Sequence, residues 1–425
     1  MVGEKQLRWT WLGVAAALLA ACSDEPAESP QPDSFALLDS AGIVIVLNHA
    51  DTSALPVWRL DSAAVLRIGN PEGDPAEEFA SIVDAVVLSD GSIAVAENRA
   101  MQIRFFAADG RHIRTVGNRG SGPGEYRQIY SIHRFAGDSL VVLDTFQSRA
   151  TVLAPDGQTA RVVPLLPPTG TFPDGTPAPI PGIRPAMPAE GGGWITVAEP
   201  PNVLPPGLRP PVLAAMPIVV IRYNDAGSIA DTLLVTRGVE TLFTPAVGPQ
   251  GEAGYQVMRP GVTLQTYIAL RGDGFFVGES TQFVVNLHDG DGGIIRSIRY
   301  PRLDRPYEDE EFQRRRERAM ASARNDQHRA ALEIMLDPVY KPAMRPSFTD
   351  LEVDESGKLW VREWSDVPDE PARWLVFDAD GRAIAVAEIP RAVLEVGSQR
   401  VVVLERDELD VQSVGVYPFV RPSVR

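Results

Sequence analysis

Short runs of alternating hydrophobic and polar residues fill the chain from about residue 80 to residue 417. The clearest are SIAVAE (92–97) and SLVVLD (139–144), and each lies between turns rich in glycine and aspartate. Runs of four to six residues with an apolar side chain at every second position are typical of antiparallel strands. The pattern therefore predicts an all-β protein.

These runs repeat. A shift of 47 residues aligns 78–116 with 125–163 without a gap. Each unit contains four runs, and the second ends in an acid. Four weaker copies follow, containing GGWITVAE (192–199), DGFFVGE (273–279), SGKLWVRE (356–363) and SQRVVVLE (398–405). Four strands in about 45 residues, repeated six times, indicate a six-bladed β-propeller of four-stranded antiparallel blades.

The sixth unit ends before its last strand, and the missing text occurs at the other end of the chain. AAVLRIGN (63–70) is similar to the last-strand text HIRTVGN (112–118) but follows no strands of its own unit. We therefore predict that the N-terminal segment joins the C-terminal blade and closes the ring, which removes the exposed sheet edges. GIVIVLN (42–48) is expected at the same seam.

The loop GNRGSGPGEY (117–126) looks at first like a phosphate-binding loop. It lacks the Gly-Lys-Ser/Thr ending of a P-loop, and it occupies the same place between units as the degenerate copy GNPEGDPAEEF. Glycine allows positive φ where the chain turns. We expect this loop to pass the chain from one blade to the next.

The N-terminus has the features of a secretory signal. Lys5 and Arg8 precede the apolar run WLGVAAALLA, which is too short for a comfortable transmembrane helix. The run leads into Leu-Ala-Ala-Cys, which resembles the bacterial lipobox, and Cys22 is the single cysteine. Residues 1–21 are therefore predicted to be a lipoprotein signal peptide and Cys22 the lipidated residue; an ordinary signal with an accidental cysteine is the alternative.

Three further segments stand apart from the strand pattern. Residues 22–40 begin with the acidic, proline-rich text SDEPAESPQPDS and are predicted to be a disordered tether before a propeller over 41–425. Residues 164–217 are dense in proline and predict irregular inserted loops. Residues 303–346 form a helical insertion, with one helix expected over 307–337.

The repeated segments together resemble the six-bladed propeller lipoproteins that are widespread in bacteria and similar to NHL-repeat proteins. The segments that carry the resemblance are DGSIAVAENRAMQIRFFAADG, GNRGSGPGEY, GDSLVVLDTFQSRATVLAPDG, GKLWVREWSD and RDELDVQSVGVYPF. With their weaker copies they cover nearly everything after residue 40. The resemblance implies an architecture rather than an activity, because propellers serve binding, hydrolysis and lyase chemistry alike.

The acids that end the second strands are the candidate site residues: Glu97, Asp144, Glu199, Glu279, Glu363 and Glu405. The resemblance places this strand end on the face where ligands usually bind, so six carboxylates could form a ring that attracts calcium. The resemblance also implies a structural alternative, in which each acid accepts hydrogen bonds from amides of the following turn.

The net charge, the histidines and the serine motifs reduce the number of possible functions. With 56 acidic and 40 basic residues the formal net charge is −16, which makes a nucleic-acid partner improbable on electrostatic grounds. The histidines have no metal-ligand spacing, and no Gly-x-Ser-x-Gly elbow occurs.

Two functions remain. The leading one is an exported propeller, anchored to the bacterial cell envelope through Cys22, that binds a peptide, a glycan or an envelope protein. The alternative is a calcium-dependent hydrolase or lyase of lactonase type with its site at the tunnel mouth. We expect convergence of three or more of these acids on one point near the axis to favour the enzyme, and hydrogen bonds to amides within turns to weaken that candidate.

Overall fold

The computed structural model of this chain describes residues 34–69, 75–165, 184–188, 193–198, 204–205, 207–247, 253–271, 274–367, 371–390 and 392–421. The signal peptide (1–21), Cys22, most of the tether, Glu199 and residues 166–183 of the proline-rich segment lie outside them. Predictions about these parts stay predictions. Among the described residues, no helix has the length and apolar character needed to cross a membrane.

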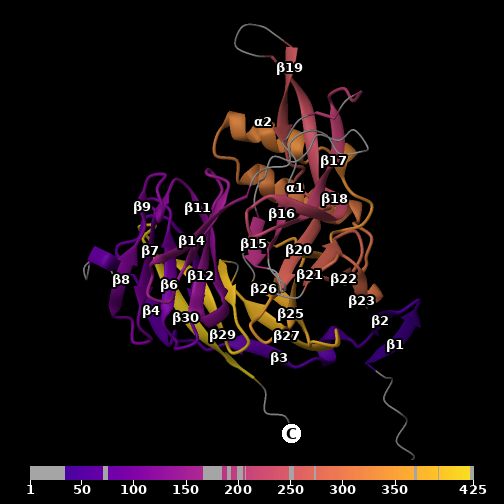
Figure 1. Ribbon diagram of the computed structural model, residues 1–425. Helices are drawn as coiled ribbons and strands as arrows, with labels where there is room; N and C mark the ends of the chain where they lie inside the picture. The colour runs from indigo at the N-terminus through magenta and orange to yellow at the C-terminus, as the bar shows by residue number, and fades with distance from the viewer. Residues whose placement is uncertain are drawn as a thin grey trace, which may run out of the picture. The chain divides into compact units, whose positions relative to one another are not determined.

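Two antiparallel meanders of four strands come first (Figure 1). One consists of β5 (Ile82–Val87), β6 (Ile93–Glu97), β7 (Gln102–Phe106) and β8 (His112–Val116). The other consists of β11 (Ile129–Phe135), β12 (Ser139–Asp144), β13 (Arg149–Leu153) and β14 (Thr159–Pro164). They are the two units that the 47-residue shift aligns.

The loop between these meanders makes a turn, as predicted. It contains the short parallel pair β9 (Asn118–Arg119) and β10 (Glu125–Tyr126). Gly117 and Gly124 have φ of 92° and 72°. The Arg149 guanidinium donates to the carbonyl oxygens of Ser121 and Gly122 at 3.0 Å each, so the loop is held against β13.

Two larger sheets follow. The third meander consists of β15 (Arg184–Pro188), β16 (Trp194–Ala198), β17 (Val212–Tyr223) and β18 (Ile229–Val247), with β19 (Ala253–Met258) added at its edge. The fourth consists of β20 (Thr266–Arg271), β21 (Gly274–Glu279), β22 (Val284–Asp289) and β23 (Ile294–Arg299). β15, β16 and the start of β17 fall within 164–217, so that segment is not loop throughout.

The last two meanders share one continuous sheet. β24 (Phe348–Val353), β25 (Leu359–Glu363), β26 (Ala372–Phe377) and β27 (Ala383–Ile389) form the fifth. β28 (Val393–Val396), β29 (Arg400–Arg406) and β30 (Gln412–Val420) form the sixth. β4 (Leu66–Ile68) pairs antiparallel with β30, at the place expected for residues 63–70, and β3 (Val57–Leu60) pairs with both β27 and β30.

Two predictions about the N-terminal segment were wrong. β2 (Ile43–Asn48) pairs in parallel with β23 of the fourth meander and not at the seam. Its Asn48 amide donates to the Gly381 carbonyl at 3.0 Å and accepts from the Ala383 amide at 2.8 Å, which fixes that position. Residues 35–40, assigned to the tether, form β1 (Phe35–Ser40), because they can pair with β2 in a hairpin.

The helical insertion contains two helices instead of one. α1 (Asp309–Ala321) and α2 (Asp326–Met335) are separated by a break at 322–325. The Asn325 side chain caps α2 by accepting from the His328 amide at 2.8 Å. Arg315 and Arg318 of α1 both donate to the Asp366 carboxylate, and these bonds join the helix to the segment after β25.

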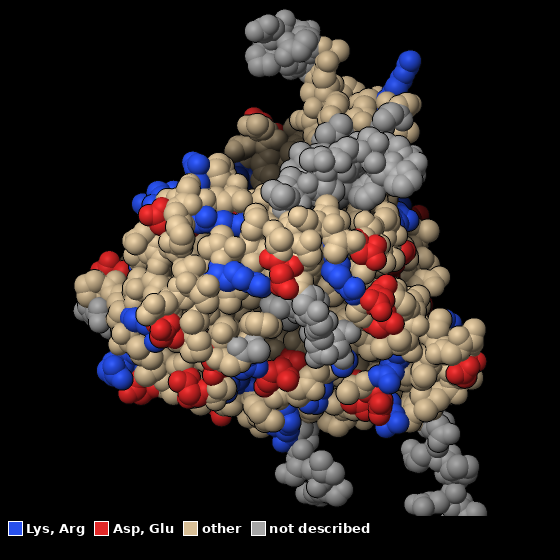
Figure 2. Space-filling view, viewed as in Figure 1, with Lys and Arg blue, Asp and Glu red and all other residues tan. Residues whose placement is uncertain are grey.

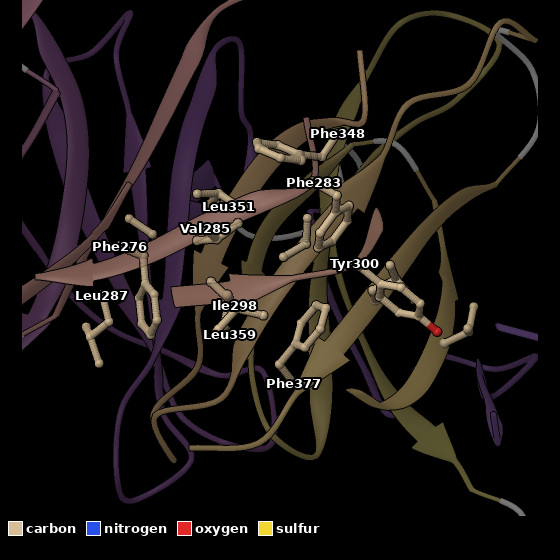
Figure 3. Close-up of a cluster of buried hydrophobic side chains, with 14 residues drawn as sticks. Phe276, Phe283, Val285, Leu287, Ile298, Tyr300, Phe348, Leu351, Leu359 and Phe377 are labelled. Atoms are coloured by element: carbon tan, nitrogen blue, oxygen red, sulfur yellow. The ribbon is translucent and has the colours of Figure 1, made fainter. Parts of the chain in front are cut away.

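Aromatic side chains fill the core between the fourth and fifth meanders (Figure 3). The Phe283 ring lies edge-on to Phe348 at 5.5 Å between centroids and tilted against Phe377 at 5.9 Å. All three are fully buried. Edge-to-face rings stabilise such a core beyond the area that they bury.

Candidate functional site

Glu97 and Asp144 accept hydrogen bonds from turn amides. The Glu97 carboxylate accepts from the amides of Ser81 at 2.9 Å and Ala100 at 2.5 Å. The Asp144 carboxylate accepts from the amides of Arg127 at 2.7 Å and Gln147 at 3.0 Å. Both side chains are buried. For these two acids the geometry is that of the structural alternative.

The other acids of the expected ring each have different surroundings. Glu405 accepts two hydrogen bonds from Arg67 of β4, at 2.6 and 3.0 Å, and these bonds lower the pKa of its carboxyl. Glu363 pairs with Arg373 at 3.2 Å, although burial raises the pKa of Glu363. Glu279 is exposed and accepts from the Thr236 hydroxyl at 3.3 Å.

These acids do not assemble a metal site in the part of the chain that the structure describes. No group of three or more His, Cys, Asp or Glu side chains there is placed to hold a metal ion. Glu199 lies outside the described residues. The five histidines lie on different elements: His49 after β2, His112 in β8, His133 in β11, His288 in β22 and His328 in α2.

A cavity of about 720 Å³ lies between the first strands of the meanders. The first strands contact one another in chain order: β28 contacts β5, β5 contacts β11, β11 contacts β15, β15 contacts β20 and β20 contacts β24. Residues of β5, β11, β20, β24 and β28 line the cavity. A hollow of about 440 Å³, lined by residues of β5, β11 and β28, shares Asp84, Tyr130 and Leu394 with it. A hollow of about 460 Å³ beside the end of β11 shares Arg134 with it.

Four of the five first strands that line the cavity have a register shift at the cavity. The shifts lie between Ile82 and Asp84 in β5, between Ile129 and Ser131 in β11, between Phe348 and Asp350 in β24, and between Val393 and Glu395 in β28. A bulge bends its strand and redirects the next side chain, and such bulges are common beside functional sites. Asp84 and Asp350 thereby join the cavity wall.

Asp84 connects β5 to β11. Its carboxylate accepts from the backbone amides of Ile132 and Ala85, at 2.9 Å each. Burial raises the pKa of Asp84 to about 8 and the nearby charge of Glu395 adds to the shift, although the two amides oppose it. Asp84 therefore holds a proton at neutral pH.

Glu352 and Glu395 also line this cavity, as do three further acids: Asp350, Asp354 and Glu355. Burial raises the pKa of Glu352 to about 8, and the charges of Asp350, Asp84 and Glu395 contribute. The Glu352 side chain is exposed to solvent, and that solvent fills a cavity lined by five strands. Burial also raises the pKa of Glu395 to about 7, while the Val87 amide at 2.9 Å and Arg134 lower it.

Basic groups from β11 and β20 face the same space. His133 lies 3.0 Å from the Ser131 hydroxyl, and burial lowers its pKa to about 4, so it is neutral at pH 7. Arg134 donates to the Val87 carbonyl at 3.2 Å, and Arg271 also lines the cavity. The cavity therefore combines proton-holding carboxyls with a neutral imidazole and two guanidinium groups.

The sequence pattern did not predict this cavity, because the predicted site residues were the acids at the ends of the second strands. A signal existed in the first strands, where acids interrupt apolar text: Asp84 in SIVDAVV, Asp350 and Glu352 in TDLEV, and Glu395 in VLEV. A charge inside a short apolar strand is costly unless it is paired or faces a cavity.

The comparisons with known proteins point to the fold. A family model described as "6-bladed beta-propeller" matches residues 76–152, which contain β5 to β12 and most of β13. No curated protein matches the chain.

Several solved structures are similar at low identity. A protein of Bacteroides fragilis described as exported is 11% identical, with a TM-score of 0.47 over 90% of this chain and 100% of that one. Virginiamycin B lyase of Staphylococcus aureus is 10% identical, with 0.38 over 85% and 100%. Regucalcin of Agrobacterium tumefaciens, described as a calcium-binding protein, is 10% identical, with 0.35 over 87% and 99%. Such values carry no information on activity.

Over residues 76–152 the chain thus matches the six-bladed β-propeller family, and the strands that follow continue in similar antiparallel meanders to residue 420.

Proposed function

We propose that this chain is an exported, lipid-anchored propeller that binds a small polar ligand with a cationic group in the cavity between its first strands. The observation that carries the proposal is the cavity of about 720 Å³ with Asp84, Glu352 and Glu395 in its wall. Ligand sites are typically concave, with a few convergent polar groups among apolar walls. The cationic amine of a peptide or of an amino sugar meets this description.

The proposed ring has six blades of four strands, and β4 serves as the last strand of the C-terminal blade. The pairing of β4 with β30 supports this arrangement, as does the contact between β28 and β5. Closure keeps the first strands around one axis, so that acids from blades far apart in sequence can act on one ligand.

Proton release is the expected signature of binding. Near pH 7 Asp84 and Glu352 hold protons because burial and the nearby negative charges disfavour their ionised forms. A bound cation supplies the opposite charge and lowers their pKa, so protons leave as the ligand enters.

Calorimetry of the mature chain tests this proposal. The probes are spermidine, a dilysine peptide and glucosamine, each titrated at pH 7 in two buffers of different ionisation enthalpy. We expect at least one probe to bind with proton release and to weaken about tenfold or more in Glu352→Gln. Glu333→Gln, on the exposed face of α2, is the matched control. Binding that is unchanged in both Glu352→Gln and Asp84→Asn would refute the site, as would no binding by any probe.

Anchoring has its own test. We expect the chain expressed in bacteria to incorporate labelled palmitate and to fractionate with membranes, and Cys22→Ala to do neither. A chain that is cleaved and released without label would mean an ordinary signal peptide.

A hydrolase or lyase is the second candidate, and one observation favours it. Carboxyl groups that hold protons at neutral pH can serve as general acids. A calcium-dependent form would need ligands beyond the groups that the described residues bring together. A screen of lactones and esters with and without calcium, repeated with Glu352→Gln, separates this candidate from simple binding.

A further inference from the structure

The hairpin of β1 and β2 forms the outer margin of the fourth sheet (indigo in Figure 1). β2 pairs with β23, and β1 pairs with β2 alone, so β1 is an edge strand. Ala41 and Gly42 form the tight turn between them, with φ of 55° and 86°. The hairpin is therefore regular and fixed to the sheet on one side.

Large apolar side chains of this hairpin are exposed on both of its faces. Leu37 and Leu38 are 54% and 53% exposed, and Val44 is 37% exposed. Neighbouring residues of a strand point to opposite faces, so the two leucines cannot be covered by one flat protein surface. Ile294 and Ile295 of the adjacent β23 are also exposed, at 38% and 46%.

Charge is scarce in the same hairpin. Asp39 is the single charged residue of the text FALLDSAGIVIVLN (35–48). In a chain with a net charge of −16, this segment is exceptionally apolar for a surface. An apolar edge strand with a single charge would be an aggregation hazard if nothing covered it.

The position of the hairpin along the chain favours a membrane as its covering. Ser34, where the described chain begins, lies twelve residues after Cys22. Twelve residues span about 40 Å when fully extended and about 20 Å on average when flexible. A lipid on Cys22 therefore keeps the hairpin within reach of the membrane surface. Leu409 is exposed as well, at 84%, but an acidic residue lies on each side of it in the sequence.

We propose that the β1–β2 hairpin rests in the headgroup region of the bilayer that holds the lipid of Cys22, with Leu37 and Leu38 buried in it. A bilayer surrounds the edge of the hairpin and covers both faces, which a single protein partner does not. The acid at position 39 favours zwitterionic over anionic phospholipids. This inference rests on the proposed lipidation.

The test uses the lipidated full chain in phosphatidylcholine vesicles. Lipidation consumes the thiol of Cys22, so an introduced cysteine is the sole thiol available for labelling. Leu38→Cys carries an environment-sensitive dye, and Leu409→Cys is the matched control at an exposed leucine of the β29–β30 turn.

We expect the dye at position 38 to shift to shorter wavelength on vesicles and to be quenched by brominated acyl chains, and the dye at position 409 to do neither. A vesicle-bound chain whose dye at position 38 stays in water overturns the inference and leaves the proposed anchoring intact. A chain that lacks the lipid and does not associate with vesicles overturns both. Val44→Cys, labelled in the same way, provides a second position should Leu38→Cys fail to fold.

Discussion

At the scale of single residues, Glu352 makes stability depend on pH. The pKa of this carboxyl is about 8 in the folded protein, against an ordinary value of 4.5. Between these values the folded chain holds a proton that the unfolded chain releases, so stability falls as pH rises from about 4.5 to 8.

We expect Glu352→Gln to flatten this fall and to raise stability at pH 8.5 by on the order of 1 kcal/mol, since solvent in the cavity screens the charge. Urea unfolding at pH 5 and pH 8.5 measures the effect, with Glu333→Gln as the control. If the free energy of unfolding falls equally with pH in the wild type and in Glu352→Gln, the pKa of Glu352 is not raised by the cavity.

Asp144 gives a second prediction, which concerns stability and metal removal together. Its carboxylate is fully buried and accepts two backbone amides, so Asp144→Asn would replace an acceptor by a donor. The expected loss is about 2–3 kcal/mol in urea unfolding. Asp156→Asn, at an exposed turn acid that accepts from the Gln158 amide, should cost much less.

Chelator should leave the melting temperatures of the wild type and Asp144→Asn unchanged, because both amides are protein groups. A melting temperature that chelator lowers in the wild type alone would instead make Asp144 a metal ligand.

The sequence predicted where the second-strand acids lie but not what each of them does. Glu97 and Asp144 follow one rule, because their strands end in the same kind of turn, whereas Glu405 pairs with Arg67 from a strand 338 residues away. A periodic sequence pattern does not reveal which distant residue a side chain will contact. The cavity acids were missed for the same reason, since they come together only when five strands from different parts of the chain line one cavity.

At the scale of elements, the period-two pattern predicted most of the strands, but it did not predict the breaks and pairings that depend on individual residues. The runs that alternate with period two became strands in all six units. The single expected helix over 307–337 became two because Asn325 caps the second. β1 was missed because FALLDS has no clear alternation, and it forms a strand through pairing with β2. The parallel partner of β2 could not be predicted, because β23 belongs to a unit about 250 residues away.

The contact between β4 and β30 can be tested at one glycine. A Cβ on Gly69 would lie 2.7 Å from Ser413 Cβ and 2.8 Å from Ser413 Cα, and the φ of Gly69 is +123°. Gly69→Ala should therefore cost on the order of 3 kcal/mol, from backbone strain and overpacking together. Gly42→Ala is the matched control, because Gly42 also has positive φ, at +86°, but no atom lies within 4 Å of its Cβ position. Its expected cost is about 1 kcal/mol. Equal losses in thermal unfolding would mean that β4 does not pack closely on β30.

At the scale of the whole molecule, the surface charges are spread out and do not mark a binding site. Figure 2 shows acidic and basic side chains interspersed over the visible face, despite the net charge of −16. Many of these residues form exposed ion pairs, such as Arg59 with Glu388 at 3.1 Å, and each pair of this kind stabilises the fold little. The organisation of the molecule depends more on how its N-terminal strands join its C-terminal sheet.

That junction supplies the last prediction. β3 and β4 bring Trp58 and Ile68 into the core, at 8% and 1% exposure, and cover the edges of β27 and β30. A chain that begins at residue 70 would leave those edges and that apolar surface open, so we expect it to aggregate or to lose its cooperative thermal transition. A chain that begins at Ser34 keeps every described strand and should melt within about a degree of the mature protein. Adding a synthetic peptide of residues 55–69 to the shorter chain should restore a cooperative transition, since the peptide can pair with both edges. If the chain from residue 70 melts cooperatively at the temperature of the longer chain, the N-terminal strands pair with the sheet but do not stabilise it.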